Sequence, residues 1–271
     1  TDMSIKERRA WSLRLGPEYM HQQIISGRLE DAVEIGQKLG QQPGDKLSND
    51  ALENLVLVES ARGRALEQLG RFPEALAAFE NAQRISSDLN ESSLVHLQAV
   101  AGTAGAYLKL GESQKAALML EAILESYTDD ERPPFLSMET LTRAYRILGN
   151  AKVRLKDFDG ATPLYEHAEN LASSFGIPTE IVDSLNGLAA CHYFKGDIKT
   201  ATRTWEQALK VAENWDLIQH RAVLLGNLGE MALSAGQSAR AQDLLSRAEA
   251  LHGHLGSDEG IAECARLLGE S

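Results

Sequence analysis

Apolar residues along most of the chain recur with the spacing of an α-helix. Leu185, Leu188 and Ala189 follow an i, i+3, i+4 pattern, and Ala75 and Phe79 are four residues apart in a second such run. Residues with this spacing share one face of a helix. No segment shows the sustained alternation of apolar and polar residues that is typical of a strand. The pattern therefore predicts an all-α chain.

One stretch, "LGRFPEALAAFENA" at residues 69–82, recurs along the sequence. Related stretches lie at 26–39, 110–123, 155–168, 194–212 and 234–248. The matching alanines are 40–45 residues apart, and they are Ala32, Ala75, Ala116, Ala161, Ala201 and Ala241. Self-similarity at a fixed period is the signature of a repeat protein. We therefore expect six copies of one structural unit.

Each of the last five copies follows a second helical pattern that carries a small residue, so each unit reads as helix, tight turn, helix. The small residues are Gly63, Ala104, Gly149, Ala189 and Gly229, and the turn glycines are Gly70, Gly111, Gly196 and Gly236. Glycine can end a helix in the left-handed conformation at little steric cost. Small residues let two helix backbones approach, so a bulkier residue there should cost about 1–3 kcal/mol.

Prolines and acidic residues predict where several helices begin. Pro73 and Pro178 lie where a first helical turn tolerates the missing N–H. Asp50 with Glu53 resembles a capping pair. Pro163 lies several residues into its expected helix, so we expect a bend or a late start there.

These motifs resemble the tetratricopeptide repeat (TPR), and the resemblance covers about residues 18–253. The copy that matches best contains Gly63, Leu66, Gly70, Phe72, Ala75, Phe79 and Ala82, whereas Lys156 replaces the turn glycine in a later copy. The usual repeat has 34 residues. The longer period here is similar to the long-repeat branch found in kinesin light chains, Pins-type adaptors and bacterial signalling sensor domains.

The resemblance implies a right-handed α-solenoid of about six TPR helix-turn-helix units. We expect an N-terminal helix or linker at 1–17, the TPR solenoid at 18–253 and a C-terminal capping helix at 254–271. In this family the first helices of successive repeats line a concave face, which commonly holds a peptide or a partner helix.

Residues on the first helices next to the small packing positions are candidates for binding a peptide or partner. Arginine suits capture of carboxylate or phosphate, so the ligand can carry acidic groups, and asparagine can hold a peptide N–H and C=O. The arginines can instead pair with acidic neighbours or be solvated, and Asn186 is offset by one residue from Asn227. The candidates are Arg143, Arg146, Asn150, Arg154, Asn186, Tyr193, Asn227 and Glu230.

Composition narrows the function further. The formal net charge of −12 disfavours nucleic-acid binding. Two distant cysteines favour a reducing cytoplasm, and no apolar run approaches the ~20 residues that span a membrane. No catalytic motif occurs, and His252 with His254 lacks a nearby third metal ligand. We therefore expect no enzyme activity, no cofactor and no metal.

The leading hypothesis is a noncatalytic scaffold or adaptor that binds a protein or peptide in its concave groove. The alternative is a sensory or regulatory TPR domain of a larger bacterial signalling protein, such as a kinase, ATPase or transcription regulator, that responds to a peptide or small ligand. An enzyme whose site is assembled between repeats is a third hypothesis. The open ends of a solenoid also allow self-association.

Overall fold

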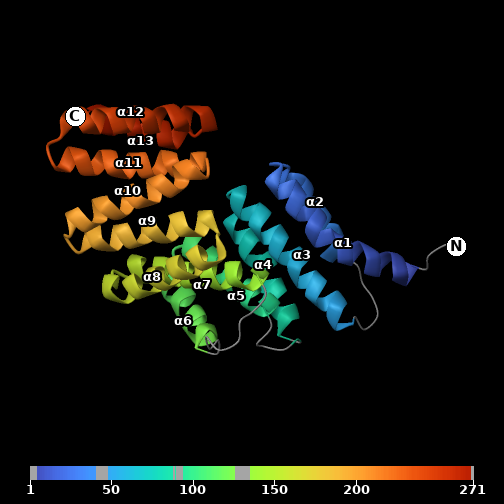
Figure 1. Cartoon of the computed structure of the whole chain (residues 1–271). Helices are drawn as coiled ribbons and strands as arrows, with labels where there is room; N and C mark the ends of the chain where they lie inside the picture. The colour runs from blue at the N-terminus through green and yellow to red at the C-terminus, as the bar shows by residue number, and fades with distance from the viewer. Residues whose placement is uncertain (1–4, 41–47, 88, 90–93, 126–134, 270–271) are drawn as a thin grey trace. The chain divides into compact units, whose positions relative to one another are not determined.

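The computed structural model describes residues 5–40, 48–87, 89, 94–125 and 135–269. Within these residues the chain forms thirteen α-helices and no strand, which confirms the predicted all-α repeat fold (Figure 1). The helices divide into two compact units, Thr1–Pro133 and Pro134–Ser271. Each unit is a stack of helices, and the turns that the structure describes within it are short.

Unit 1 holds the first six helices, which pack in sequence order. Neighbouring helices contact each other from α1 to α6, and α3 also packs against both α1 and α5. The helices are α1 (Ile5–Ile25), α2 (Leu29–Gly40), α3 (Asn49–Gln68), α4 (Phe72–Ser86), α5 (Leu94–Lys109) and α6 (Ser113–Leu124).

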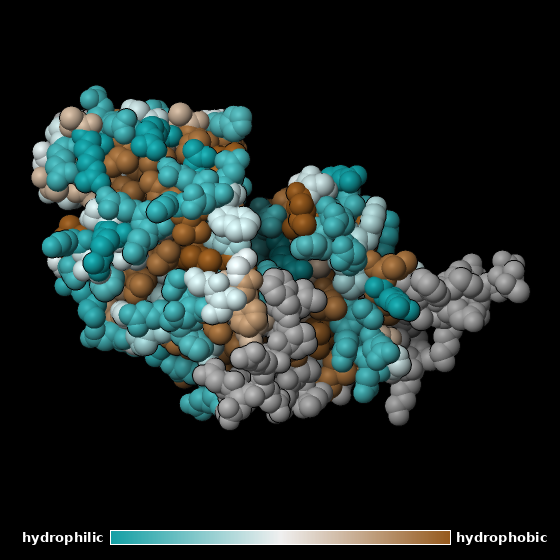
Figure 2. All heavy atoms as spheres, in the orientation of Figure 1, coloured by the Kyte–Doolittle hydropathy of each residue, from teal (hydrophilic) through white to brown (hydrophobic). Residues whose placement is uncertain are grey.

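Unit 2 holds seven helices and contains every predicted site residue. The helices are α7 (Phe135–Arg154), α8 (Phe158–Phe175), α9 (Pro178–Phe194), α10 (Ile198–Asn214), α11 (Ile218–Ser234), α12 (Ser238–Leu255) and α13 (Asp258–Gly269). Figure 2 shows hydrophilic residues over much of the visible surface, with apolar residues mainly in the spaces between helices.

The six repeat alanines occupy equivalent places in six helix hairpins. They lie in the second helix of each pair, in α2, α4, α6, α8, α10 and α12, and all are 0% exposed. An alanine at such a contact lets the two helices of a hairpin approach closely. The sequence repeat therefore corresponds to the helix hairpins of the structure.

The turns have the left-handed conformation that the glycines predict. Gly70 has φ of 73° and Gly196 has φ of 83°, and Lys156 adopts the same region with φ of 62° although it carries a side chain. The backbone geometry of the turn is thus kept where glycine is absent. An L-residue in this region costs about 1–2 kcal/mol more than glycine.

Four predictions about helix starts can be compared with the structure. Pro73 and Pro178 lie in the first turn of α4 and α9, as predicted. Of the bend or late start expected at Pro163, the late start is wrong, because α8 already begins at Phe158, and the bend stays a prediction. The Asp50 capping pair is also wrong, because α3 begins at Asn49 and the hydroxyl of Ser48 accepts a hydrogen bond from the Ala51 N–H.

Two buried aromatic rings each fill the space between glycines of neighbouring helices. A Cβ added at Gly63 of α3 or Gly102 of α5 would lie 2.7 Å or 2.3 Å from the ring of Phe79. Tyr165 of α8 has the same relation to Gly149 of α7 and Gly187 of α9. Glycine on both flanking helices therefore lets one large ring join two successive repeats.

The ends of the predicted solenoid correspond to helices. Helix α1 continues past residue 17 and α12 continues past residue 253, so both predicted domain boundaries fall inside helices. Helix α13 packs against α11 and α12, and Cys264 is buried in their core cluster. This packing fits the predicted capping helix, while the three-part division of the chain stays a prediction.

Candidate functional site

The first helices of unit 2 carry all eight predicted site residues. Arg143, Arg146, Asn150 and Arg154 lie in α7, Asn186 and Tyr193 in α9, and Asn227 and Glu230 in α11. These positions are partly exposed, except that Arg154 and Glu230 are exposed. Whether these residues bind a ligand stays a prediction, but the contacts that the structure gives for several of them show which polar groups are already engaged within the chain.

Arg146 forms an ion pair with the first turn of the next repeat. Its Nε donates to Glu180 Oε2 at 2.7 Å and its Nη2 donates to Oε1 at 3.2 Å. Burial acts to lower the pKa of Arg146, but the charge and hydrogen bonds of Glu180 outweigh it and raise the pKa above its ordinary value. For Arg146, pairing with an acidic neighbour is what the structure shows, and its charge is largely compensated within the chain.

Asp183 continues this network from α9 to α11. Its Oδ2 lies 3.6 Å from Arg146 Nη1, and its Oδ1 lies 3.4 Å from His220 Nε2. Burial acts to raise the pKa of Asp183, but the hydrogen bond with His220 and the charge of Arg146 outweigh it, so the pKa lies below the ordinary value of 3.8. Asp183 is therefore a carboxylate at neutral pH.

Asn186 and Asn227 contact each other despite their offset in the repeat. Trp205 Nε1 donates to Asn186 Oδ1 at 2.8 Å, and Asn227 Nδ2 donates to the same oxygen at 3.0 Å. The indole N–H can only donate, so it identifies the oxygen of Asn186, and the second contact then identifies the nitrogen of Asn227. The Asn186 Nδ2 group and the Asn227 Oδ1 atom have no hydrogen bond to any described residue.

A hollow of about 220 Å³ lies beside this pair, between α9 and α11. Its walls combine apolar side chains with the polar groups of the network. Val223 is 46% exposed, whereas Val182 and Leu224 are buried. The lining residues are Val182, Asp183, Asn186, Gln219, His220, Val223 and Leu224.

Two other predicted residues are engaged in packing between helices. Asn150 accepts a hydrogen bond from the hydroxyl of Tyr165 at 2.6 Å. The ring of Tyr193 lies 6.2 Å from that of Trp205, centroid to centroid. These contacts hold the second helices α8 and α10 against the first helices.

Sequence reasoning did not select Glu180, Gln219, His220 or Val223. Gln219, His220 and Val223 line the hollow, and Glu180 holds Arg146. The first-turn residues of α9 and α11 meet residues of neighbouring first helices only once the repeats stack. The repeat period of about 40 residues could have directed attention to them, because Glu180 and His220 are 40 residues apart.

The described residues hold no group of three or more His, Cys, Asp or Glu side chains placed to bind a metal ion. Burial raises the pKa of both cysteine thiols, Cys191 and Cys264, and a buried protonated thiol is a poor nucleophile. Among the described helices, none combines the length and the apolar character needed to cross a lipid bilayer.

Residues 180–253 match the family model described as "Tetratricopeptide repeat". This segment begins in α9 and ends near the end of α12, so it includes the hollow and both asparagines. No curated protein sequence is similar enough to this chain to count as a relative.

Solved structures of repeat proteins share the fold. The TPR-like repeats assigned to a kinesin light chain of Podosopora anserina match with a TM-score of 0.59 and 19% identity, over 78% of this chain and 99% of that one. The Rap conjugation gene regulator of plasmid pLS20, in complex with the Phr* peptide, matches with a TM-score of 0.65 and 14% identity, over 95% and 78%.

A third similar structure is aspartyl phosphate phosphatase F of Bacillus subtilis, with a TM-score of 0.65 and 13% identity over 98% of this chain and 80% of that one. At these identities the likeness concerns the fold. Residues 180–253 are thus tetratricopeptide repeats, and the helix hairpins of both units have the all-α repeat fold of tetratricopeptide repeat proteins.

Proposed function

We propose that this chain is a noncatalytic interaction module that binds a peptide segment of its partner across the first helices α9 and α11. The observation that carries the proposal is the asparagine pair. Asn186, which lines the hollow, offers N–H donors, and Asn227, which is hydrogen-bonded to Asn186, offers a carbonyl acceptor. A peptide group presents one C=O and one N–H, so the pair can bind both at once.

The hollow supplies a place for one side chain of that peptide. Its volume of about 220 Å³ is below the ~300–1,000 Å³ of pockets that enclose a whole small molecule. The exposed methyl groups of Val223 offer an apolar contact next to the carboxylate of Asp183. An extended peptide with a small aliphatic residue beside its bound peptide group fits this arrangement.

Charge has a smaller part in this proposal than hydrogen bonding. Arg146 is compensated by Glu180 and Asp183, so it has little charge to offer to an acidic ligand. An acidic partner stays a prediction, and Arg143 and Arg154 in α7 are the other two arginines that the sequence selected for it. A double change of Arg143 and Arg154 to alanine tests it separately from the asparagine pair.

The comparisons support a peptide ligand. The Rap regulator of similar fold is seen with the Phr* peptide. The two buried thiols are poor nucleophiles, which supports a module without cysteine-based catalysis, although one neighbour is a phosphatase. Two free cysteines favour action in the cytoplasm.

Peptides selected from a random phage-displayed library provide the test. Their affinity, measured by fluorescence anisotropy, should fall about tenfold or more for Asn227→Ala, because the hydrogen bond between the peptide and Asn227 is lost. Asn227→Ala leaves the Trp205 N–H paired with Asn186. Asn170→Ala, at an exposed asparagine of α8, is the matched control and should bind like the wild type. Equal affinity in Asn227→Ala and wild type would contradict the proposal.

A second candidate function is a sensory or regulatory domain of a larger signalling protein. The likeness of the fold to a peptide-bound gene regulator favours it. In that case peptide binding should change hydrogen exchange in helices that do not contact the peptide, such as α12 and α13. Protection confined to α9 and α11 would instead favour a passive adaptor.

A further inference from the structure

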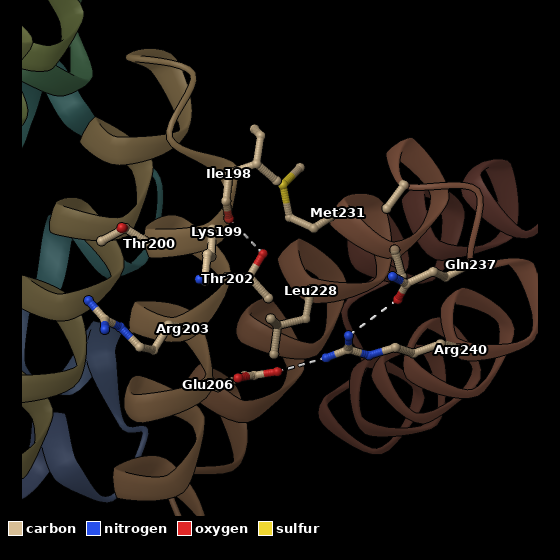
Figure 3. Close-up of a pocket in the computed structure, with 12 residues that line it drawn as sticks. Ile198, Lys199, Thr200, Thr202, Arg203, Glu206, Leu228, Met231, Gln237 and Arg240 are labelled. Atoms are coloured by element: carbon tan, nitrogen blue, oxygen red, sulfur yellow. Dashed lines mark hydrogen bonds and ion pairs between the residues drawn. The ribbon is translucent and has the colours of Figure 1, made fainter.

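A second concave surface lies on unit 2, beside the turn that joins α11 to α12. It is a groove of about 720 Å³ over the first half of α10, the second half of α11 and the start of α12 (Figure 3). Helix α11 thus presents Gln219 to Leu224 to the peptide hollow and Leu228 to Ala235 to this groove. We call this second surface the turn-edge groove.

The turn-edge groove exists because α10 and α12 do not pack against each other. Both pack on α11, whose Leu228, Met231 and Ala232 form the floor. Ile198, at the start of α10, lies beside Met231 and is 42% exposed (Figure 3). A channel between two helices with an apolar floor has the shape that a third helix can occupy.

The rim of the turn-edge groove is positively charged, in a chain whose net charge is −12. Its charged lining residues are Lys199, Arg203, Arg240 and Glu206. Glu206 accepts a hydrogen bond from Arg240 at 2.7 Å, which ties α10 to α12 across the groove. Lys199 forms no ion pair with any described residue, so its charge is available to a ligand. Arg203 also forms no ion pair with a described residue, although its charge helps to lower the pKa of Asp197.

The backbone adds to this positive potential. The first turn of α10 and the start of α12 both line the groove, and helix N-termini carry partial positive charge. Asp197 accepts a hydrogen bond from the Thr200 N–H and so caps α10. The Gln237 side chain makes no capping bond at the start of α12. A carboxylate on a bound partner is therefore favoured near α12.

We infer that the turn-edge groove is a second docking site, which takes an amphipathic helix with an apolar face and acidic flanks. The apolar face would contact Ile198, Leu228 and Met231, and the acidic flanks would meet Lys199, Arg203 and the start of α12. Charge complementarity identifies the partner as acidic, since the positive rim would repel a basic helix. This site shares no residue with the peptide hollow and does not depend on the proposed function.

The test uses a fluorescein-labelled alanine-based helical peptide with leucines at i, i+3, i+4 and i+7 and flanking glutamates. The comparison peptide has lysines in place of the glutamates. Anisotropy should show saturable binding of the glutamate peptide only. Lys199→Glu should weaken it at least about tenfold, which is about 1.4 kcal/mol, and Ile198→Asp should also weaken it.

Lys210→Glu is the matched control, because Lys210 lies on the same helix, is exposed, forms no ion pair with a described residue and does not line the groove. It changes the net charge equally and should alter affinity by less than about twofold. Amide shifts in NMR spectra should map to residues 198–206 and 228–240, and Asn227→Ala should leave binding unchanged. Circular dichroism verifies that each variant is folded.

Four results would overturn the inference. The first is that the glutamate peptide does not bind at up to about 1 mM, and the second is that the lysine peptide binds equally well. The third is that Lys199→Glu and Lys210→Glu lose the same affinity. The fourth is that the amide shifts are confined to residues 182–186 and 219–224. The last result would assign the peptide to the hollow instead, and so would distinguish this inference from the proposed function.

Discussion

Replacing Gly187 by alanine tests how one aromatic ring joins two repeats. Tyr165 lies between α7 and α9 and is 1% exposed. A Cβ on Gly187 would lie 2.3 Å from its Cε1 atom, against 3.4 Å for ordinary contact, so the ring would have to move by about 1 Å. On the other side the ring already lies against Gly149, where an added Cβ would be 2.9 Å away. The ring therefore has little room to retreat.

The magnitude follows from two opposed effects. Overpacking a well-filled contact costs about 1–3 kcal/mol. Replacing a helical glycine by alanine contributes about 0.5–1 kcal/mol in favour of folding. We expect Gly187→Ala to lower the free energy of unfolding by about 0.5–2 kcal/mol. Gly226→Ala in α11 is the matched control, because an added Cβ there meets nothing within 4 Å. It should raise the free energy of unfolding by about 0.5–1 kcal/mol.

Urea titration followed by tryptophan fluorescence measures both variants, since Trp205 lies in the core of unit 2. In a Tyr165→Leu background the loss caused by Gly187→Ala should shrink, because the atoms that clash are gone. If Gly187→Ala were as stable as Gly226→Ala, the ring would not be confined between the two helices, and the reasoning would fail.

Three further results are expected. Arg146→Met should lower the free energy of unfolding by about 3–5 kcal/mol in urea titrations, because Glu180 is left buried without a partner, and adding Glu180→Leu should recover most of that loss. Burial acts to raise the pKa of Asp183, but His220 and Arg146 lower it below the ordinary value. The Asp183 carboxylate should therefore stabilise the fold above pH 3.8, and this stabilisation should be lost as the pH falls below 3.8. In acid titrations of unfolding, Asp183→Asn should lack this pH-dependent loss of stability. Lys156→Gly should raise the thermal midpoint, with a gain of up to about 1–2 kcal/mol, because Lys156 has φ of 62°.

The repeat itself could be predicted because its signals are local. A buried alanine such as Ala75 and a turn glycine such as Gly70 lie within a few residues of each other, and each has a conformational or steric reason for its place. Copies of that short pattern predicted the hairpins. At Lys156 the pattern lacks its glycine, yet the packing of α7 on α8 still imposes the left-handed turn.

Contacts between successive repeats could not be predicted from the sequence pattern. Gly102 and Gly187 matter because a ring from the preceding repeat lies against them, and this becomes visible only when the repeats stack. The late start expected at Pro163 was wrong for a different, local reason. The preceding turn of α8 is already stabilised by Asp157, which accepts a hydrogen bond from the Gly160 N–H, so the helix begins before the proline.

The same register position in three successive first helices explains where a ligand can bind. At intervals of 40 residues it carries Arg146, Asn186 and Gly226. The arginine is neutralised by Glu180, and the glycine offers no side chain. Only at Asn186 does the position retain hydrogen-bond donors without a described partner, next to the acceptor of Asn227 and the exposed Val223. The repeat places these three residues at equivalent positions, but the neighbours of each residue decide whether its polar groups can still bind a ligand. The proposed peptide site therefore lies between α9 and α11.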